Sequence, residues 1–264
     1  MPIPTAAAPD HVAVSACLLD AEGAVLAADD ADRPYYAAST IKLHVLLAAL
    51  RAADAGSLDL DESVPATRTF LGAGSAPFTL GGDHLDPTHP ADGDSVRVRE
   101  LLTRMIDRSS NEATDHVIEL IGLDAVADAI TELGLTSTRV ERMIGDASAL
   151  AAGATNETSA ADLARTMRAL VRPTAELSPS SRGLARTALR AQQIPVIARA
   201  LREGVPWGSK SGWVDGYRHD VAFLDDPDSP DVRFLAVMTA GLDPEDADVR
   251  ILRVVRELCP DLSR

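Results

Sequence analysis

Apolar positions near the two ends of the chain follow the alternation that is typical of β-strands. Residues 12–19 alternate imperfectly and lead into a turn at 20–23, after which 24–28 form a second apolar run. Two such runs around a short turn predict a strand hairpin. Three further strand-like runs and a closing helical pattern come last, at residues 208–214, 219–224, 234–239 and 244–258.

The middle of the chain carries helical spacing instead. A helix is predicted to begin at Ser39 and to end before Gly56, and its body, residues 43–50, is apolar nearly all round, which is typical of a buried helix. Two irregular stretches, 72–95 and 139–157, separate the later helical patterns. Those patterns fall at residues 96–107, 110–121, 123–133, 158–170, 178–192 and 194–202.

This order of elements predicts the fold class. Strands at both ends and helices between them pack most simply as one antiparallel sheet with helices on its faces, joined to a helical lobe. We therefore expect an α/β (α+β) protein with a discontinuous sheet domain, residues 1–37 and 204–264. Residues 38–203 are expected to form a mainly helical domain, with the active site between the two domains.

Composition narrows the classes of function. The chain has 264 residues, 46% of them apolar, which suffices for a real core. A net charge of −15 argues against nucleic acid as a partner, because phosphate binding requires a basic face. No apolar run reaches the about 18 residues of a membrane helix, so no membrane partner is expected. The N-terminus has no signal-peptide pattern, which predicts a cytoplasmic protein, or a secreted one whose leader was removed.

Lysine is unusually rare, and this makes its two occurrences informative. Of the 25 Lys and Arg residues only Lys42 and Lys210 are lysine. Arginine replaces lysine as a surface charge, but it cannot act as a base, because its pKa is above about 12. A position that needs a neutral amine must therefore keep lysine. Both lysines lie in short strings that have the composition of an active site, Ser39-Thr-Ile-Lys42 and Lys210-Ser-Gly212.

Ser39 and Lys42 are spaced to meet on one helix face. Ser39 lies at the N-terminus of the predicted helix, where free N–H groups favour developing negative charge. Lys42 emerges into apolar surroundings, which disfavour its charged form and lower its pKa. A neutral lysine beside a serine is suited to act as the general base for a nucleophile.

Two later strings supply the remaining groups. Ser109-Ser-Asn111 falls between two predicted helices, where Ser109 is placed to relay a proton and Asn111 to bind a substrate amide. Lys210 on a predicted strand would add positive charge, and Gly212 would let a substrate lie against the strand edge. The N–H groups of Ser39 and Trp213 are then candidates for an oxyanion hole.

Taken together and in this order, the three strings resemble the Ser-x-x-Lys, Ser-Asp-Asn and Lys-Thr-Gly motifs of class A β-lactamases and penicillin-binding proteins. Further resemblance is found in the segments 33–43, 56–61 and 156–164, so that it spans about residues 12–258. It implies an inserted helical domain and a serine hydrolase that forms an acyl-enzyme on Ser39. The implied substrate is a small molecule with an amide, ester or β-lactam carbonyl, and the implied chemistry needs no metal and no organic cofactor.

The chain departs from that family at three places. Ser110 replaces the middle aspartate of the second motif, and Ser211 replaces the threonine of the third, keeping a hydroxyl for a substrate carboxylate. The family's omega-loop string Glu-x-x-Leu-Asn, whose glutamate drives deacylation, is missing. Glu141 and Asp146 are the nearest carboxylates to consider for that task. An acyl-enzyme is thus predicted without a named deacylation base, and the alternatives are a D-alanyl peptidase, a carboxylesterase or an acylated sensor domain that does not turn over.

Other polar clusters fit simpler interpretations. Arg218 either binds a substrate carboxylate, as an arginine on the neighbouring strand does in the family, or is a charge at a turn. His219 and Asp220 are adjacent on a strand and point to opposite faces, which favours structural roles. The aspartates and histidines at 83, 84, 86, 89, 92 and 94 match no standard metal spacing and predict a solvated acidic loop. Cys17 and Cys259 are expected to be free and buried.

Overall fold

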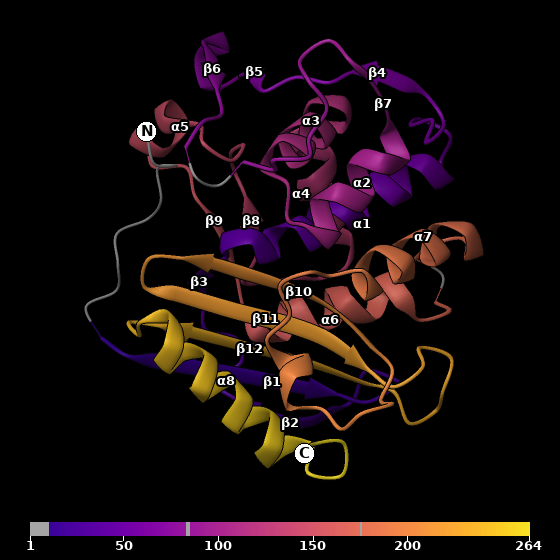
Figure 1. Cartoon of the computed structure of the whole chain (residues 1–264), viewed down its shortest axis with the longest axis vertical. Helices are drawn as coiled ribbons and strands as arrows, with labels where there is room; N and C mark the ends of the chain where they lie inside the picture. The colour runs from indigo at the N-terminus through magenta and orange to yellow at the C-terminus, as the bar shows by residue number, and fades with distance from the viewer. Residues whose placement is uncertain (1–10, 83–84, 175) are drawn as a thin grey trace.

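The computed structural model describes residues 11–82, 85–174 and 176–264. Its centre is a five-stranded antiparallel sheet in the order β10-β11-β12-β1-β2 (Figure 1). These strands span β1 Ala13–Leu19, β2 Val25–Asp29, β10 Trp207–Val214, β11 Tyr217–Leu224 and β12 Arg233–Ala240. The prediction that the first and last strands share one antiparallel sheet is confirmed.

Helices cover both faces of this sheet. Successive residues of β12 belong to different cores, since Phe234 joins the core on one face and Leu235 the core on the other. This explains why the strand is apolar from Phe234 to Met238 instead of alternating. Helix α8, Pro244–Leu258, packs on one face and helix α6, Ala160–Val171, on the other (Figure 1).

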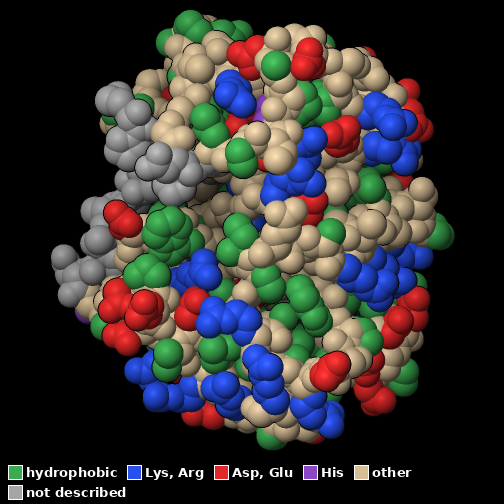
Figure 2. Space-filling view, in the orientation of Figure 1, with side chains coloured by type: hydrophobic (Ala, Val, Ile, Leu, Met, Phe, Trp, Pro, Cys, Tyr) green, Lys and Arg blue, Asp and Glu red, His purple; other side chains and the backbone are tan. Residues whose placement is uncertain are grey.

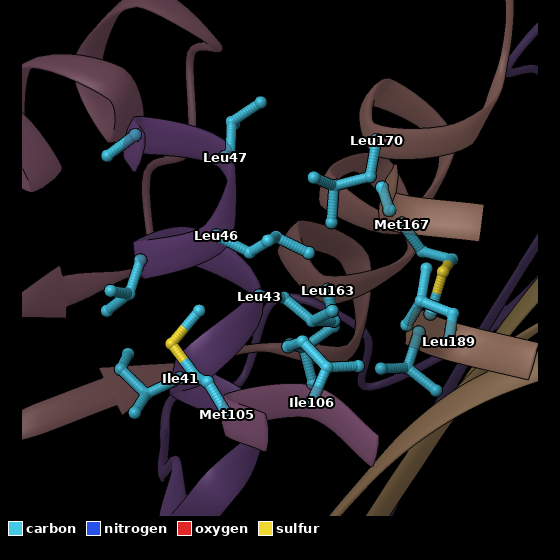
Figure 3. Close-up of a cluster of buried hydrophobic side chains, with 14 of the residues drawn as sticks. Ile41, Leu43, Leu46, Leu47, Met105, Ile106, Leu163, Met167, Leu170 and Leu189 are labelled. Carbon is cyan, nitrogen blue, oxygen red and sulfur yellow. The ribbon is translucent and has the colours of Figure 1, made fainter. Parts of the chain in front are cut away.

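The remaining helices form the helical region. Their apolar faces meet around α1, from which Leu43, Leu46 and Leu47 point toward side chains of α2, α6 and α7 (Figure 3). Serine caps start several of them, as Ser110 does for α3, where its side chain accepts the N–H of Ala113. The bounds are α1 Lys42–Asp54, α2 Val98–Asp107, α3 Asn111–Ile121, α4 Leu123–Glu132, α5 Ala147–Ala151 and α7 Pro179–Arg190.

Short strands and short 3₁₀ helices lie between the longer elements. The short strands are β3 Tyr35–Tyr36, β4 Ser63–Pro65, β5 Thr69–Leu71, β6 Pro77–Thr79, β7 Ser95–Arg97, β8 Arg139–Val140 and β9 Asn156–Thr158. The short 3₁₀ helices are η1 Ala38–Ile41, η2 Ala73–Ser75 and η3 Ile197–Ala200. The predicted helix at 194–202 is therefore wrong, because only η3 forms there. Pro195 has no N–H, and the next two amides bond a side chain of the sheet instead of helical carbonyls.

The surface matches the acidic, arginine-rich composition. Blue and red side chains lie next to one another over the face in Figure 2, and ion pairs such as Arg186–Asp228 and Arg233–Asp261 connect them. Within the described ranges, no helix is long and apolar enough to cross a bilayer. Cys17 and Cys259 are free and buried, as expected.

Candidate active site

Ser39 sits in the short helix η1, directly before α1, and is partly exposed. Ala38, the residue before it, has a φ of 47°, in the left-handed region that a residue with a side chain seldom adopts. A Cβ on Gly212 of β10 would lie 2.9 Å from the backbone nitrogens of Ser39 and of Thr40. The glycine therefore lets the strand edge approach the backbone of Ser39 and Thr40, which is a different reason for Gly212 than room for substrate.

Lys42 begins α1, and its side chain is fully buried. The amine nitrogen lies 3.2 Å from Ser39 Oγ and 3.2 Å from Ser109 Oγ. It donates to the Ser109 carbonyl oxygen and to Asn111 Oδ1, each at 2.7 Å. The two short bonds leave one position on the nitrogen facing the serine hydroxyls.

The environment favours the neutral form of that amine. Burial lowers the pKa of Lys42 well below its ordinary value of 10.5, and the nearby Lys210 lowers it further, while Asp115 and Glu112 act in the opposite direction. A neutral amine has two N–H bonds and one lone pair. The N–H bonds match the two carbonyl oxygens, and the lone pair then accepts the hydroxyl of Ser39. This is the geometry of a base next to its nucleophile.

Ser109 joins the two lysines. It lies in the turn between α2 and α3 with a φ of 59°, another left-handed residue that has a side chain. Its Oγ lies 3.2 Å from the Lys42 amine and accepts an N–H from Lys210 Nζ at 3.0 Å. Strained backbone of this kind persists where the surroundings hold it, commonly at functional sites.

Lys210 differs from Lys42 in the charge around it. Burial lowers the pKa of Lys210 to about 7, Asp220 raises it and Arg218 lowers it. Its amine also donates to the carbonyl oxygen of Ser211 at 2.6 Å. The pKa of Lys210 therefore lies near neutral pH, and the carboxylate of Asp220 favours the charged form of the amine.

A cavity of about 300 Å³ opens beside Ser39. Its walls bring together residues from η1, the α2–α3 turn, β10 and β11. All the predicted site residues except the two lysines line it, and the lysines lie buried behind the serines. The lining residues are Ser39, Leu85, Arg108, Ser109, Asn111, Ile194, Ser211, Gly212, Trp213 and Arg218.

Ser211 and Arg218, which were predicted to bind substrate, also bond groups within the protein. The Ser211 hydroxyl donates to the Ile194 carbonyl oxygen at 2.6 Å. Arg218 Nε donates to Asp248 Oδ1 at 2.8 Å, and its side chain still borders the cavity. Trp213 is 41% exposed and borders both this cavity and a second one.

The second cavity, of about 60 Å³, lies on another side of Ser39. Among the described residues that line it there is no carboxylate. The lining residues are Tyr36, Ala38, Ser39, Ile41, Asn111, Arg142, Ile144, Asn156, Trp213 and Val214. The charged side chain in its lining is that of Arg142, a cation that is 2% exposed.

Arg142 is held in place by neighbouring groups. Its guanidinium donates to Tyr36 Oη at 2.9 Å and to the Met143 carbonyl oxygen at 3.2 Å. Sequence reasoning missed Arg142, because nothing in the irregular stretch 139–157 marks one of many arginines as buried. Asp115 was missed too; it is fully buried, accepts the Ile144 N–H at 2.8 Å, and burial raises its pKa well above the ordinary value.

Neither carboxylate considered for deacylation borders a cavity at Ser39. Asp146 caps α5 and accepts N–H groups of Ala73, Ser148 and Ala149, and these bonds keep its pKa below the ordinary value despite partial burial. Glu141 is exposed and accepts the N–H of Thr155. Both carboxylates therefore have roles in the local structure.

The acidic loop is less solvated than expected. Asp86 and His89 are buried, and Asp86 binds Arg104 and Thr88, so the prediction of a solvated loop is wrong for these two residues. The residues at positions 92 and 94 are exposed, and those at 83 and 84 lie outside the described residues. Within the described ranges, no three His, Cys, Asp or Glu side chains are grouped as metal ligands.

Comparisons with known proteins agree with this fold. The sequence profile of the β-lactamase enzyme family matches residues 5–259, and the chain belongs to that family. It is similar to a β-lactamase structure from Sphaerobacter thermophilus, with 27% identity, coverage of 94% of this chain and 89% of that one, and a TM-score of 0.76. A comparison with curated protein sequences finds no match.

Two further structures show the same fold. A β-lactamase from Xanthomonas campestris is 23% identical, with a TM-score of 0.78 and coverage of 95% of this chain and 91% of that one. A mutant of PBP-A, described as an acyl-enzyme complex with penicillin G, is 23% identical, with a TM-score of 0.76 and coverage of 96% and 92%. These two likenesses show a shared fold, and membership of the β-lactamase enzyme family rests on the sequence profile.

Proposed function

We propose that this protein is a serine hydrolase that forms an acyl-enzyme on Ser39. The observation that carries the proposal is the chain of contacts from Ser39 Oγ through the buried Lys42 amine to Ser109 Oγ and Lys210. A nucleophile, a base that burial keeps neutral and a relay to a second lysine are the groups that acyl transfer requires.

Acylation begins at the Ser39 hydroxyl. The oxygen attacks an amide, ester or β-lactam carbonyl, and its proton passes to the lone pair of Lys42. The proton then passes through Ser109, with Lys210 alongside, to the nitrogen or oxygen that leaves. General base catalysis of this kind contributes about 10²–10⁴ in rate.

The larger cavity is suited to hold the substrate during this step. The backbone N–H groups of Ser39 and Trp213 are the proposed donors to the oxyanion. Asn111, Gly212 and Ser211 border the space next to the carbonyl, and Arg218 adds positive charge for an anionic substrate. The substrate class is a small amide, ester or β-lactam, and no cofactor enters the steps.

Deacylation is proposed to be the slow step. A water that attacks the acyl group needs a base near Ser39, and the described walls of both cavities supply none that is a carboxylate. This observation favours, as the second candidate, a domain that stays acylated and acts as a sensor. D-alanyl peptidase and carboxylesterase activities use the same acylation chemistry and differ in the substrate, so both are alternatives to hydrolysis of a β-lactam.

Intact mass spectrometry over time tests the proposal. The protein is incubated with a penicillin, a cephalosporin or a p-nitrophenyl ester, and the covalent adduct and the released product are followed together. We expect an adduct of the acyl mass on Ser39. An adduct that decays with product marks an enzyme, and one that persists marks the sensor.

Ser39→Ala is the control for the assignment of the nucleophile. The variant removes one oxygen from a partly exposed residue, so the fold is expected to be retained. If Ser39→Ala forms the adduct and turns over at the wild-type rate, the proposed function is wrong.

A further inference from the structure

Asp220 is a buried carboxylate that the acylation steps leave unused. It lies on β11 directly opposite Ser211 of β10, and the two side chains share one face of the sheet. Its residue is fully buried. Oδ2 accepts the backbone N–H groups of Val196 and Ile197, each at 2.8 Å. Oδ1 has no hydrogen-bond partner in the described part of the chain.

The two amides belong to the segment that borders the larger cavity. Ile194, just before Pro195, lines that cavity and is 48% exposed. Its carbonyl oxygen accepts the hydroxyl of Ser211. Asp220 thus holds residues 196 and 197 against this face of the sheet, and Ser211 of the neighbouring strand holds Ile194 there, so the cavity wall depends on both sets of bonds.

Charges of the site also act on Asp220, although Lys210, the neighbour of Ser211 on β10, points to the other face of the sheet. Burial raises the pKa of Asp220 to about 6, while the N–H groups of Ile197 and Val196 and the charges of Lys210 and Arg218 favour its ionised form. Arg218 is paired with Asp248 of α8, which also binds Arg199 of η3, and the residue opposite Asp220 on β12 is the apolar Val237. Of the charges that act on Lys210, Asp220 favours the protonated amine and Arg218 opposes it.

We propose that Asp220 is a positioning residue for acylation, which fixes the Ile194 wall next to Ser211 and keeps Lys210 charged beside Ser109. This inference rests on the proposed function, since it assigns Lys210 a charge that the proton relay uses. The adjacent His219 has a different role from Asp220. Its Nε2 bonds the Tyr36 carbonyl oxygen, and its Nδ1 accepts the Thr239 N–H.

A buried carboxylate that binds backbone amides is also a common structural device. Asp162 of α6 supplies the matched case. It is fully buried, and its Oδ2 accepts the Ser137 N–H at 2.9 Å and the Thr138 hydroxyl at 2.9 Å, but it does not line either cavity at Ser39. Asp162→Asn therefore reports what the loss of a buried charge does to stability alone.

The experiment compares Asp220→Asn with Asp162→Asn. The rate constant for acylation by a p-nitrophenyl ester is measured from pH 5 to pH 9, together with thermal unfolding of each variant. We expect Asp220→Asn to acylate about tenfold more slowly at neutral pH, the scale for loss of one charge-assisted hydrogen-bonding group. Asp162→Asn should lower the melting temperature while it acylates at the wild-type rate.

The pH dependence of the acylation rate is the measurement that a purely structural role of Asp220 would leave unchanged. Removing the negative charge lowers the pKa of Lys210 further below about 7, so the ammonium is lost at lower pH. The alkaline limb of the acylation profile should therefore move to lower pH by about one unit in Asp220→Asn. Asp220→Glu keeps the charge but displaces the acceptor, so it should retain the limb and lose rate.

Two results would overturn the inference. In one, Asp220→Asn acylates at the wild-type rate with an unshifted alkaline limb while Ser39→Ala does not acylate, which leaves the proposed function intact. In the other, Asp220→Asn and Asp162→Asn lose the same rate in proportion to their loss of stability. If Asp220→Asn does not fold, the Asp220→Glu profile decides, since an unchanged rate there contradicts the positioning role.

Discussion

Ser39 lies between two cavities whose walls differ in chemistry. On the side of about 300 Å³, hydroxyls, an amide, apolar side chains and the cations Arg108 and Arg218 border the space, and two buried lysines lie behind the serines. On the side of about 60 Å³, the wall consists of aromatic and aliphatic side chains, two asparagines and the buried cation Arg142. Ser39 borders both cavities. The two walls therefore differ in which step of the proposed reaction they can support.

The comparison teaches that forming and releasing an acyl group make separate demands on a fold. Acylation needs a base that reaches the serine hydroxyl, and Lys42 lies 3.2 Å from it. Release needs a base that reaches a water on the acyl carbon. A cation and apolar groups do not provide this, because neither accepts a proton at neutral pH.

The largest expected effect comes from removing the base on the acylation side. Lys42→Arg keeps a positive charge but stays protonated, so it cannot accept the Ser39 proton. We expect the acylation rate constant to fall about a thousandfold, within the range for loss of a general base. Stopped-flow release of p-nitrophenol measures it.

Folding of Lys42→Arg is checked by circular dichroism, because a guanidinium has to fit where an amine was. Retention of even about a tenth of the wild-type acylation rate would contradict the role of Lys42 as a base, since a general base contributes at least about a hundredfold.

The next largest effect should come from giving the second cavity a carboxylate. Ile144 borders that cavity together with Ser39. Ile144→Glu is expected to accelerate decay of the acyl-enzyme about a hundredfold, because a positioned carboxylate activates water as a general base. The measurement is the half-life of the adduct by intact mass.

Ile144→Gln is the matched control, with nearly the same shape and no basic oxygen. If the glutamine variant deacylates as fast as the glutamate variant, the increase comes from a more open cavity. The contrast between the two sides of Ser39 would then rest on access of water instead of on a missing base.

A smaller effect is expected where the strand edge meets the nucleophile. Gly212→Ala places a Cβ 2.9 Å from two backbone nitrogens of η1, so β10 has to move by a few tenths of an ångström. We expect about a tenfold loss in acylation rate, since small displacements at a reacting centre are costly. The rate assay used for Lys42→Arg measures it.

Gly183→Ala provides the comparison for that variant. Gly183 lies in α7, and a Cβ added there would meet open space. Alanine at this position should raise stability by about 0.5–1 kcal/mol without a change in acylation. Equal acylation rates for Gly212→Ala and wild type would show that the strand edge tolerates the methyl group.

The sheet and most helices were predictable, and the failures come from partners that are distant in sequence. The closing helix begins at Pro244 after the cap Asp243, signals that depend on neighbours in sequence. The helix expected at 194–202 did not form, because Asp220, distant in sequence, takes the amides of residues 196 and 197. Short strands such as β8 and β9 depend on their pairing partners and leave little trace in a periodic pattern.

That the residues around the larger cavity lie together was predictable, because they are rare or ordered along the chain. Lys42 and Lys210 were marked by composition, and the structure brings both to Ser109. The other side was not, because Arg142 and Ile144 belong to common residue types in an irregular stretch. Whether a side chain there faces Ser39 is decided by tertiary packing, which a single sequence does not encode locally.

The burial of both lysines affects how the protein meets reagents in solution. The chain has no other side-chain amine, and neither of these two is exposed. Acylating labels and amine cross-linkers that act on side chains would find no lysine on the surface. Modification of Lys42 or Lys210 by such a reagent requires that their buried surroundings open, so side-chain amine labelling becomes a measure of that opening.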